Sequence, residues 1–220
     1  LTSDGTDISW EDASGGGASA INDLSDAKTF GTGSIMLGDA TTGTISGANY
    51  NTGLGVDIFA ALTTGDGNVA VGNKALAANT TGIGNIAIGW ETLDASTTTS
   101  YNIAIGQSAL GANTTGDGNV AVGFASLDAN TTSDNNTAVG YNALTANTDG
   151  ENNVAVGHAT MEANTSGGSN TAVGKGSLGA NTTASYGTAV GYFALTANTT
   201  GNSNTAVGFA ALDANTTAAN

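Results

Sequence analysis

The chain has 220 residues, a formal net charge of −15 and no cysteine, so neither disulfides nor thiolate metal sites can stabilise it. Its 18 acidic residues face three lysines and no arginine, which leaves too few cations to neutralise nucleic-acid phosphates or to attract anionic lipid. No apolar run approaches the ~20 residues of a membrane-spanning helix. Composition therefore predicts no nucleic-acid partner and no membrane insertion.

Residues 1–31 are predicted to form a leader or linker segment. They are polar and acidic, and the run Gly15–Gly17 gives a flexible joint because glycine reaches backbone conformations that other residues avoid. A disordered chain end is the alternative for this segment.

From residue 32 onward a unit of 17 residues recurs without insertion or deletion. We number the positions of this unit 1 to 17, with Asp66 at position 1 of the first regular copy. Two degenerate units fill residues 32–65 and nine regular units fill residues 66–218. Position 7 is a glycine in every copy: Gly38, Gly55, Gly72, Gly89, Gly106, Gly123, Gly140, Gly157, Gly174, Gly191 and Gly208. A fixed period in this range predicts a stacked repeat architecture, with atypical units at its end.

Each unit contains the pattern of a short strand. In the nine regular copies, positions 4 and 6 are β-branched, position 5 is always alanine, and the glycine at position 7 closes the run. A second short strand is predicted around positions 11 and 13, for example at Leu144 and Ala146, before an Asn-Thr-Thr-Gly turn. The predicted fold is all-β, a parallel β-solenoid (β-roll or β-helix) of 17-residue rungs. Eleven rungs at ~4.8 Å would give a rod of roughly 50 Å.

The constant alanine also leads to a prediction about assembly. Side chains alternate between the two faces of a strand, and we expect Thr137 and Val139 to face the core together with Leu144. Ala138 and Gly140 would then point outward. A solvated face would tolerate larger side chains, yet position 5 never varies in the regular copies. The sequence therefore predicts that a second copy packs against this face, in a homo-oligomer that is most plausibly a homotrimer.

Two families share parts of this pattern. The first half of each unit, as in Asn136-Thr-Ala-Val-Gly140, resembles the head repeat of trimeric autotransporter adhesins, which fold as left-handed parallel β-rolls with a shorter unit. The longer unit, with its Ala-Leu-x-Ala-Asn-Thr-Thr-Gly tail, is similar to repeats in bacteriophage tail fibres. The resemblance implies a structural shaft in a trimeric fibre, located on a virion or on an extracellular cell surface.

Such a shaft acts as a spacer for host-receptor binding, with other virion or appendage components as partners. The alternative is a bacterial adhesin head whose rungs bind host surface ligands directly. Fibres of this kind often finish in a receptor-binding tip, so we expect the fibre to continue beyond Asn220.

Residues for catalysis are few. His158 is the one histidine, it lies at position 8, and no Ser-His-Asp arrangement can be argued around it. We predict no enzyme activity, no catalytic residue and no cofactor. Position 8 instead carries five aromatic residues, which either pack across a subunit interface or stack on the sugar rings of a host glycan. Interface packing is the favoured interpretation for Trp90, Phe124, Tyr141, Tyr192 and Phe209.

Three further columns of residues admit two interpretations each. Asp117, Asp134 and Glu151 lie at position 1 of successive units, either as solvated carboxylates, which we favour, or beside a calcium ion. Asn-x-Thr/Ser sequons recur, for example at Asn113 and Asn198. Stacked side-chain amides explain them without glycans. The threonines at positions 15 and 16 raise an ice-binding hypothesis, which is weakened because adjacent residues of a strand face opposite ways.

Overall fold

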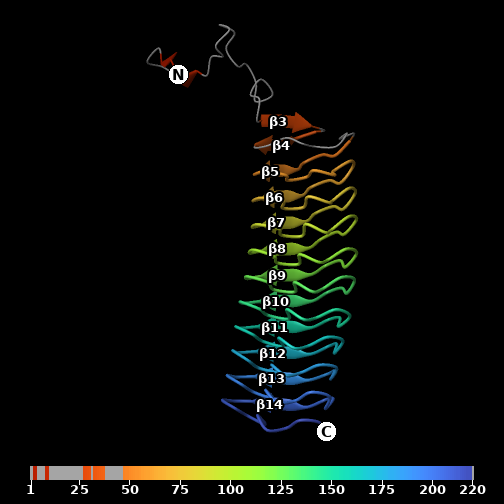
Figure 1. Ribbon diagram of the computed structural model, residues 1–220, viewed down its shortest axis with the longest axis vertical. Coiled ribbons are helices and arrows are strands. Elements are labelled where there is room, and N and C mark those ends of the chain that lie inside the picture. The colour runs from red at the N-terminus through yellow and green to blue at the C-terminus, as the bar shows by residue number, and fades with distance from the viewer. Residues whose placement is uncertain (1, 4–7, 10–26, 31, 38–46, 220) are drawn as a thin grey trace.

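The computed structural model describes residues 2–3, 8–9, 27–30, 32–37 and 47–219, so the predicted glycine joint lies outside the described residues. The described part has no helix and is built from short strands in chain order (Figure 1). The strands are β1 (Thr2–Ser3), β2 (Ile8–Ser9), β3 (Ala27–Phe30), β4 (Ser34–Leu37), β5 (Thr52–Leu54), β6 (Val69–Val71), β7 (Ile86–Ile88), β8 (Ile103–Ile105), β9 (Val120–Val122), β10 (Thr137–Val139), β11 (Val154–Val156), β12 (Thr171–Val173), β13 (Thr188–Val190) and β14 (Thr205–Val207).

The strands β4 to β14 stack in sequence order as parallel neighbours within one 12-stranded sheet. Pairing follows the repeat, because Thr137 lies opposite Val154 and Ala138 opposite Ala155, an offset of one unit. The predicted parallel β-solenoid of 17-residue rungs is therefore confirmed. Strand β3 joins the same sheet antiparallel to β4, and it comes from the segment predicted as a leader. Strands β1 and β2 form a separate antiparallel pair.

The assignment of strand faces from the sequence was wrong. Ala138 is fully buried in the core beside Leu144, whereas Thr137 and Val139 are only partly covered and lie on the outer face. The interior of a rung is narrow and the leucine at position 11 fills it. An inward-facing strand residue must therefore be small, and the β-branched side chains point outward. The constant alanine is explained by the chain's own core, so it gives no argument for a neighbouring copy.

One degenerate rung shows how tightly this interior is filled. The rung of residues 49–65 carries Phe59 at position 11 and Ile58 at position 10, both buried, and its residue at position 5 is Gly53. A Cβ placed on Gly53 would lie 2.5 Å from Ile58 Cδ1 and 3.1 Å from Phe59 Cε2. The larger side chains at positions 10 and 11 are thus accommodated by glycine in place of alanine at position 5.

The second predicted strand is also wrong, because positions 8 to 13 form turns. The residues at positions 9 and 11 have left-handed backbone conformations, for example Asn142 (φ 53°) and Leu144 (φ 52°). These residues reverse the chain and bring the leucine inward. The turns still bond from rung to rung, since Leu144 N donates to Thr160 O at 3.0 Å.

Two columns of buried asparagines run along the solenoid, at positions 3 and 14. At position 3, Asn153 N donates to Asn136 Oδ1 (3.0 Å), and Asn136 Nδ2 donates to Gly150 O (2.9 Å). At position 14, Asn164 Nδ2 donates to Asn147 Oδ1 at 2.8 Å. The predicted stacking of asparagine amides is confirmed. No buried side-chain nitrogen or oxygen in the described residues lacks a hydrogen-bond partner.

Replacing Asn136 with alanine is expected to destabilise the solenoid by about 2 kcal/mol, because buried partners on two rungs lose their hydrogen bonds. For a chain of this length such a loss lowers the melting temperature by roughly 4–8 °C. Asn142→Ala is the matched control, since Asn142 is partly exposed and Ala125 and Ala159 occupy the same position in other rungs. Thermal melts in which both variants lose equal stability would contradict a structural role for the asparagine column.

Candidate interaction surfaces

The outer face of the solenoid sheet is an exposed apolar strip. Positions 4 and 6 of successive strands point outward and carry valine, isoleucine or threonine along β6 to β14. These side chains are partly covered at most rungs and more exposed at others, as at Ile88 (38 %), Val173 (37 %) and Val190 (37 %). The strip carries no charged residue at these two positions. A contiguous apolar surface of this length is typical of an interaction site.

The aromatic residues of position 8 form a stacked column beside the strip. Phe124 and Tyr141 stack with ring centroids 5.1 Å apart, and Tyr141 and His158 with centroids 5.2 Å apart. Tyr192 and Phe209 stack at 5.5 Å. All of these rings are exposed, yet stacking covers both faces of Tyr141 and one face of each of its column neighbours Phe124 and His158. Because a sugar ring stacks on a free aromatic face, this geometry favours packing over glycan binding for the stacked members of the column.

The two remaining residues of interest at position 8 are Trp90 and His158. Trp90 is half exposed, and its neighbours in the column are Asn73 and Gln107. His158 is exposed, and its imidazole stacks on Tyr141. Within the described residues no hydroxyl or carboxylate bonds to that imidazole, so the structure brings no catalytic arrangement together around it.

The aspartate carboxylates of position 1 accept hydrogen bonds from the backbone of the preceding rung. Asp117 Oδ1 accepts a hydrogen bond from Ser100 N, and Asp134 Oδ1 accepts one from Asp117 N, both at 2.7 Å. No group of three or more acidic, histidine or cysteine residues in the described part of the chain is placed to hold a metal ion, so the geometry around Asp117, Asp134 and Glu151 does not support the calcium hypothesis.

Other charged groups lie near the turns. At position 12, burial raises the pKa of Asp94 and of Asp128 above the ordinary aspartate value. The pKa of Lys74 is raised by its hydrogen bond to Glu91 and by that carboxylate's charge, with Nζ and Oε1 3.0 Å apart. The ion pair of Lys74 and Glu91 joins two neighbouring rungs, and none of these charged groups forms a site.

The sequons and threonines are largely accounted for by the fold. Asn113 and Asn198 are buried, and their Nδ2 groups donate to Gly116 O (2.9 Å) and Gly201 O (3.0 Å), which leaves the amides inaccessible. Thr114 Oγ1 donates to Thr131 O in the next rung at 3.0 Å. Thr114 and Thr115 are both exposed because they lie in a bend, so the expectation that they face opposite ways was wrong.

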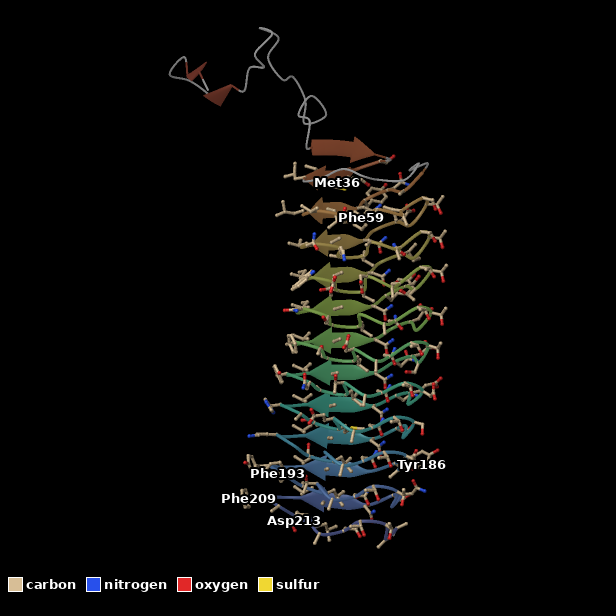
Figure 2. All side chains as sticks on the ribbon, viewed as in Figure 1. Met36, Phe59, Tyr186, Phe193, Phe209 and Asp213 are labelled. Atoms are coloured by element: carbon tan, nitrogen blue, oxygen red, sulfur yellow. The ribbon has the colours of Figure 1, made fainter. Side chains whose placement is uncertain are left out.

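Three tyrosines at position 2 are further exposed aromatic residues that sequence analysis did not single out. Tyr50, Tyr101 and Tyr186 are about two-thirds exposed. Figure 2 shows Tyr186 on the side of the stack opposite Phe193 and Phe209. The sequence signal that could have found Tyr50 and Tyr101 is the Asp-Gly pair that follows each of them one rung later.

Comparison with known protein families, with curated proteins and with solved structures gave no match to this chain. The described residues also include no helix that is long and apolar enough to cross a membrane. What is established is a β-solenoid with tandem repeats and an asparagine ladder, and function has to be argued from its surfaces.

Proposed function

We propose that the solenoid is the structural shaft of a homotrimeric fibre on a virion or a cell surface, and that it acts as a spacer for host-receptor binding. The observation that carries this proposal is the uninterrupted, in-register ladder from β4 to β14. Strands and turns bond every rung to the next, and the two asparagine columns add bonds between most rungs, so bending the rod would break several hydrogen bonds at once. We assign no catalytic role, and the proposed partners are other copies of the chain and other components of the virion or appendage.

The apolar strip supports the association of copies. With strands three residues long and nine rungs ~4.8 Å apart, the strip measures roughly 40 by 10 Å, or about 400 Å². The neighbouring aromatic column would bring the surface towards the ~800 Å² per partner of a standard interface. A second copy presents the same apolar columns at the same rung spacing, so the two strips match along their whole length. The resemblance to trimeric fibre repeats suggests three copies.

The oligomeric state is tested by the mass in solution. Analytical ultracentrifugation is expected to give about three times the chain mass of 21.2 kDa at micromolar concentration. A monomer under these conditions would overturn the proposed trimer.

Placing charges on the strip is expected to dissociate the oligomer without unfolding the rungs. The variant Val122→Glu/Val156→Glu puts two carboxylates on partly covered outer positions, where an interface would bury them unpaired. Thr132→Glu is the matched control, because Thr132 is exposed at position 16 and Asp149 occupies that position in the next rung. Sedimentation should show loss of the trimer only for the strip variant, with circular dichroism unchanged in both. A strip variant that remains trimeric would rule out this face as the interface.

The second candidate function is a surface adhesin whose rungs bind host ligands directly, and the exposed side chain of Trp90 favours it. The stacked rings expose their edges, and Trp90 carries no stacked neighbour in the described column. Binding of the isolated solenoid to host cells would support the adhesin. Binding that requires other components of the fibre would support the shaft.

A further inference from the structure

The tyrosines of position 2 occupy a place that stability does not explain. Tyr50 and Tyr101 are both 64 % exposed, and both have left-handed backbone conformations, with φ of 59° and 60°. Bulky residues disfavour this region, and the same position holds glycine, asparagine or serine in the regular rungs without tyrosine. Each ring is therefore neither buried nor favoured by the local backbone, which is a pattern associated with ligand-binding positions.

Each ring rests against the glycine of the rung before it. A Cβ placed on Gly84 would lie 3.0 Å from Tyr101 Cδ1 and 3.2 Å from Cε1, and one on Gly33 would lie 3.1 Å from Tyr50 Cδ1. The Cδ1–Cε1 edge of each ring thus lies against the backbone of the preceding rung.

The rung after each tyrosine places no side chain at the same position, and each ring stays 64 % exposed. Position 2 of that rung is again a glycine, Gly67 after Tyr50 and Gly118 after Tyr101. Around Gly67 the nearest atom to an added Cβ is Gly84 N at 4.0 Å. Beyond Gly118, Asn135 Oδ1 reaches over the glycine, 2.9 Å from where a Cβ would lie. The ring of Tyr101 and the amide of Asn135 therefore border a shallow shelf whose floor is glycine backbone.

A fixed carboxylate lies beside each shelf. Asp66 Oδ1 accepts a hydrogen bond from Asn49 N (2.6 Å), and Asp117 Oδ1 accepts one from Ser100 N (2.7 Å). These bonds hold the aspartate next to the open glycine. The second oxygen, Oδ2, takes no hydrogen bond from the described residues, so it is available to accept one from a ligand.

The same constellation occurs twice. Glycine, tyrosine and Asp-Gly on three successive rungs are Gly33, Tyr50 and Asp66-Gly67 in the first copy, and Gly84, Tyr101 and Asp117-Gly118 in the second. The copies lie three rungs apart, which corresponds to ~14 Å along the rod. Tyr186 is followed by Asn202 and Ser203, so it lacks both the carboxylate and the open glycine.

We propose that these two shelves bind neutral saccharides, with a sugar ring stacked on Tyr50 or Tyr101 and its hydroxyl groups donating to Asp66 or Asp117. A pyranose has an apolar C–H face that suits the flat ring, and hydroxyl donors that suit a carboxylate acceptor. The net charge of −15 disfavours acidic sugars. A proline-rich peptide also stacks on tyrosine, but its carbonyl groups cannot donate a hydrogen bond to the fixed carboxylate. Two sites on one rod would increase the affinity for a long glycan chain.

The test begins with a printed array of neutral and acidic oligosaccharides. Lactose, maltotriose, chitotriose and a heparin tetrasaccharide are then titrated individually, with saturation-transfer NMR and calorimetry as readouts. A neutral sugar is expected to bind at two sites per chain. Tyr101→Asn should reduce the stoichiometry to one, and Tyr50→Asn/Tyr101→Asn should abolish binding. Asp117→Ser should weaken the second site by roughly tenfold, as expected for a charge-assisted hydrogen bond.

Other rungs of the chain already contain the residues that these substitutions introduce, so the variants are expected to fold. Asn135 and Asn152 hold asparagine in the left-handed conformation of position 2, with φ near 60°. At position 1, Ser100 Oγ accepts from the backbone of the preceding rung as the aspartates do, with Ile83 N as donor at 3.2 Å. Tyr186→Asn is the control that should leave binding unchanged.

Three results would overturn the proposal: no neutral saccharide bound at millimolar concentration, binding that survives the double tyrosine variant, or tyrosine-dependent binding of a proline-rich peptide alone. Sedimentation of the same samples separates this inference from the proposed shaft. A trimer that binds no sugar refutes only the shelves, and a monomer that binds sugar refutes only the trimer.

Discussion

Replacing Gly140 with alanine is expected to destabilise the solenoid by at least about 3 kcal/mol and to lower its melting temperature by roughly 6–12 °C. Gly140 has φ of 139°, and a Cβ at this position would lie 2.3 Å from Gly157 O in the next rung. The neighbour is backbone and cannot move aside without breaking the ladder, in which Gly157 N also donates to Val139 O at 2.8 Å. The glycine at position 7 is thus required by both its conformation and the close approach of rungs.

Gly67→Ala is the matched control for this prediction. Gly67 also has a positive φ, 69°, but no atom lies closer than 4.0 Å to an added Cβ. Alanine adopts a similar conformation in this chain at Ala125, where φ is 49°. The control should therefore cost only about 1–2 kcal/mol, the conformational term alone. If thermal melts show equal losses for the two variants, the close approach of rungs is not what selects glycine at position 7.

Enlarging the core at Ala143 is expected to destabilise the chain by about 3 kcal/mol, and removing one methyl group opposite should restore part of that loss. Ala143→Ile places at position 10 the residue that Ile58 provides in the rung of residues 49–65. In that rung the facing residue at position 5 is Gly53, whose added Cβ would lie 2.5 Å from Ile58 Cδ1. Position 5 of the Ala143 rung is Ala138, so the isoleucine has no room.

The double variant Ala138→Gly/Ala143→Ile tests whether the side chains of positions 5 and 10 pack against each other in the core. A double-mutant cycle measured by thermal or denaturant unfolding should give a favourable coupling of about 1–2 kcal/mol, since each single change spoils a fit that the pair restores. The control cycle pairs Ala143→Ile with Ala189→Gly, three rungs away, and should be additive. Additive effects in the first cycle would refute the account of why position 5 is alanine.

The repeat made the stacking predictable. Because the glycine column recurs at an invariant interval, the sequence predicts which residues lie above one another, and the pairing of Ala138 with Ala155 follows directly. The buried asparagine ladder was predictable for the same reason. An amide that recurs on nearly every rung can bond to its own copies, as Asn136 Oδ1 does in accepting from Asn153 N.

The direction of the side chains was not predictable from alternation alone. Period-2 spacing separates Ala138 from Thr137 and Val139, but it does not say which set faces inward. The expectation that larger side chains fill a core fails here because Leu144, from the turn, occupies the interior. The rung of residues 49–65 indicates which set faces inward. Position 5 shrinks to Gly53 where position 11 grows to Phe59, so both positions share the interior.

The turn at positions 8 to 13 could not be predicted from the sequence for a different reason. A leucine with φ of 52°, as at Leu144, contradicts the residue's own preference, so local propensity predicts a strand at that place. The conformation is imposed by the need to bring position 11 inward and to bond with the next rung. Of the candidate site residues, the alignment of Phe124 with Tyr141 was predictable from the period, whereas the exposure of Tyr50 and Tyr101 depends on backbone placement.

The invariant spacing of the bonded columns restricts how a rod of this kind can change in length. An insertion of a few residues would displace the glycine and both asparagines from their partners above and below, so many hydrogen bonds would be lost together. Duplicating or deleting a whole unit, such as residues 134–150, instead joins two edges that already match. Length therefore changes in discrete steps of ~4.8 Å. Recombination between units could adjust the reach of such a rod while each remaining rung keeps its neighbours.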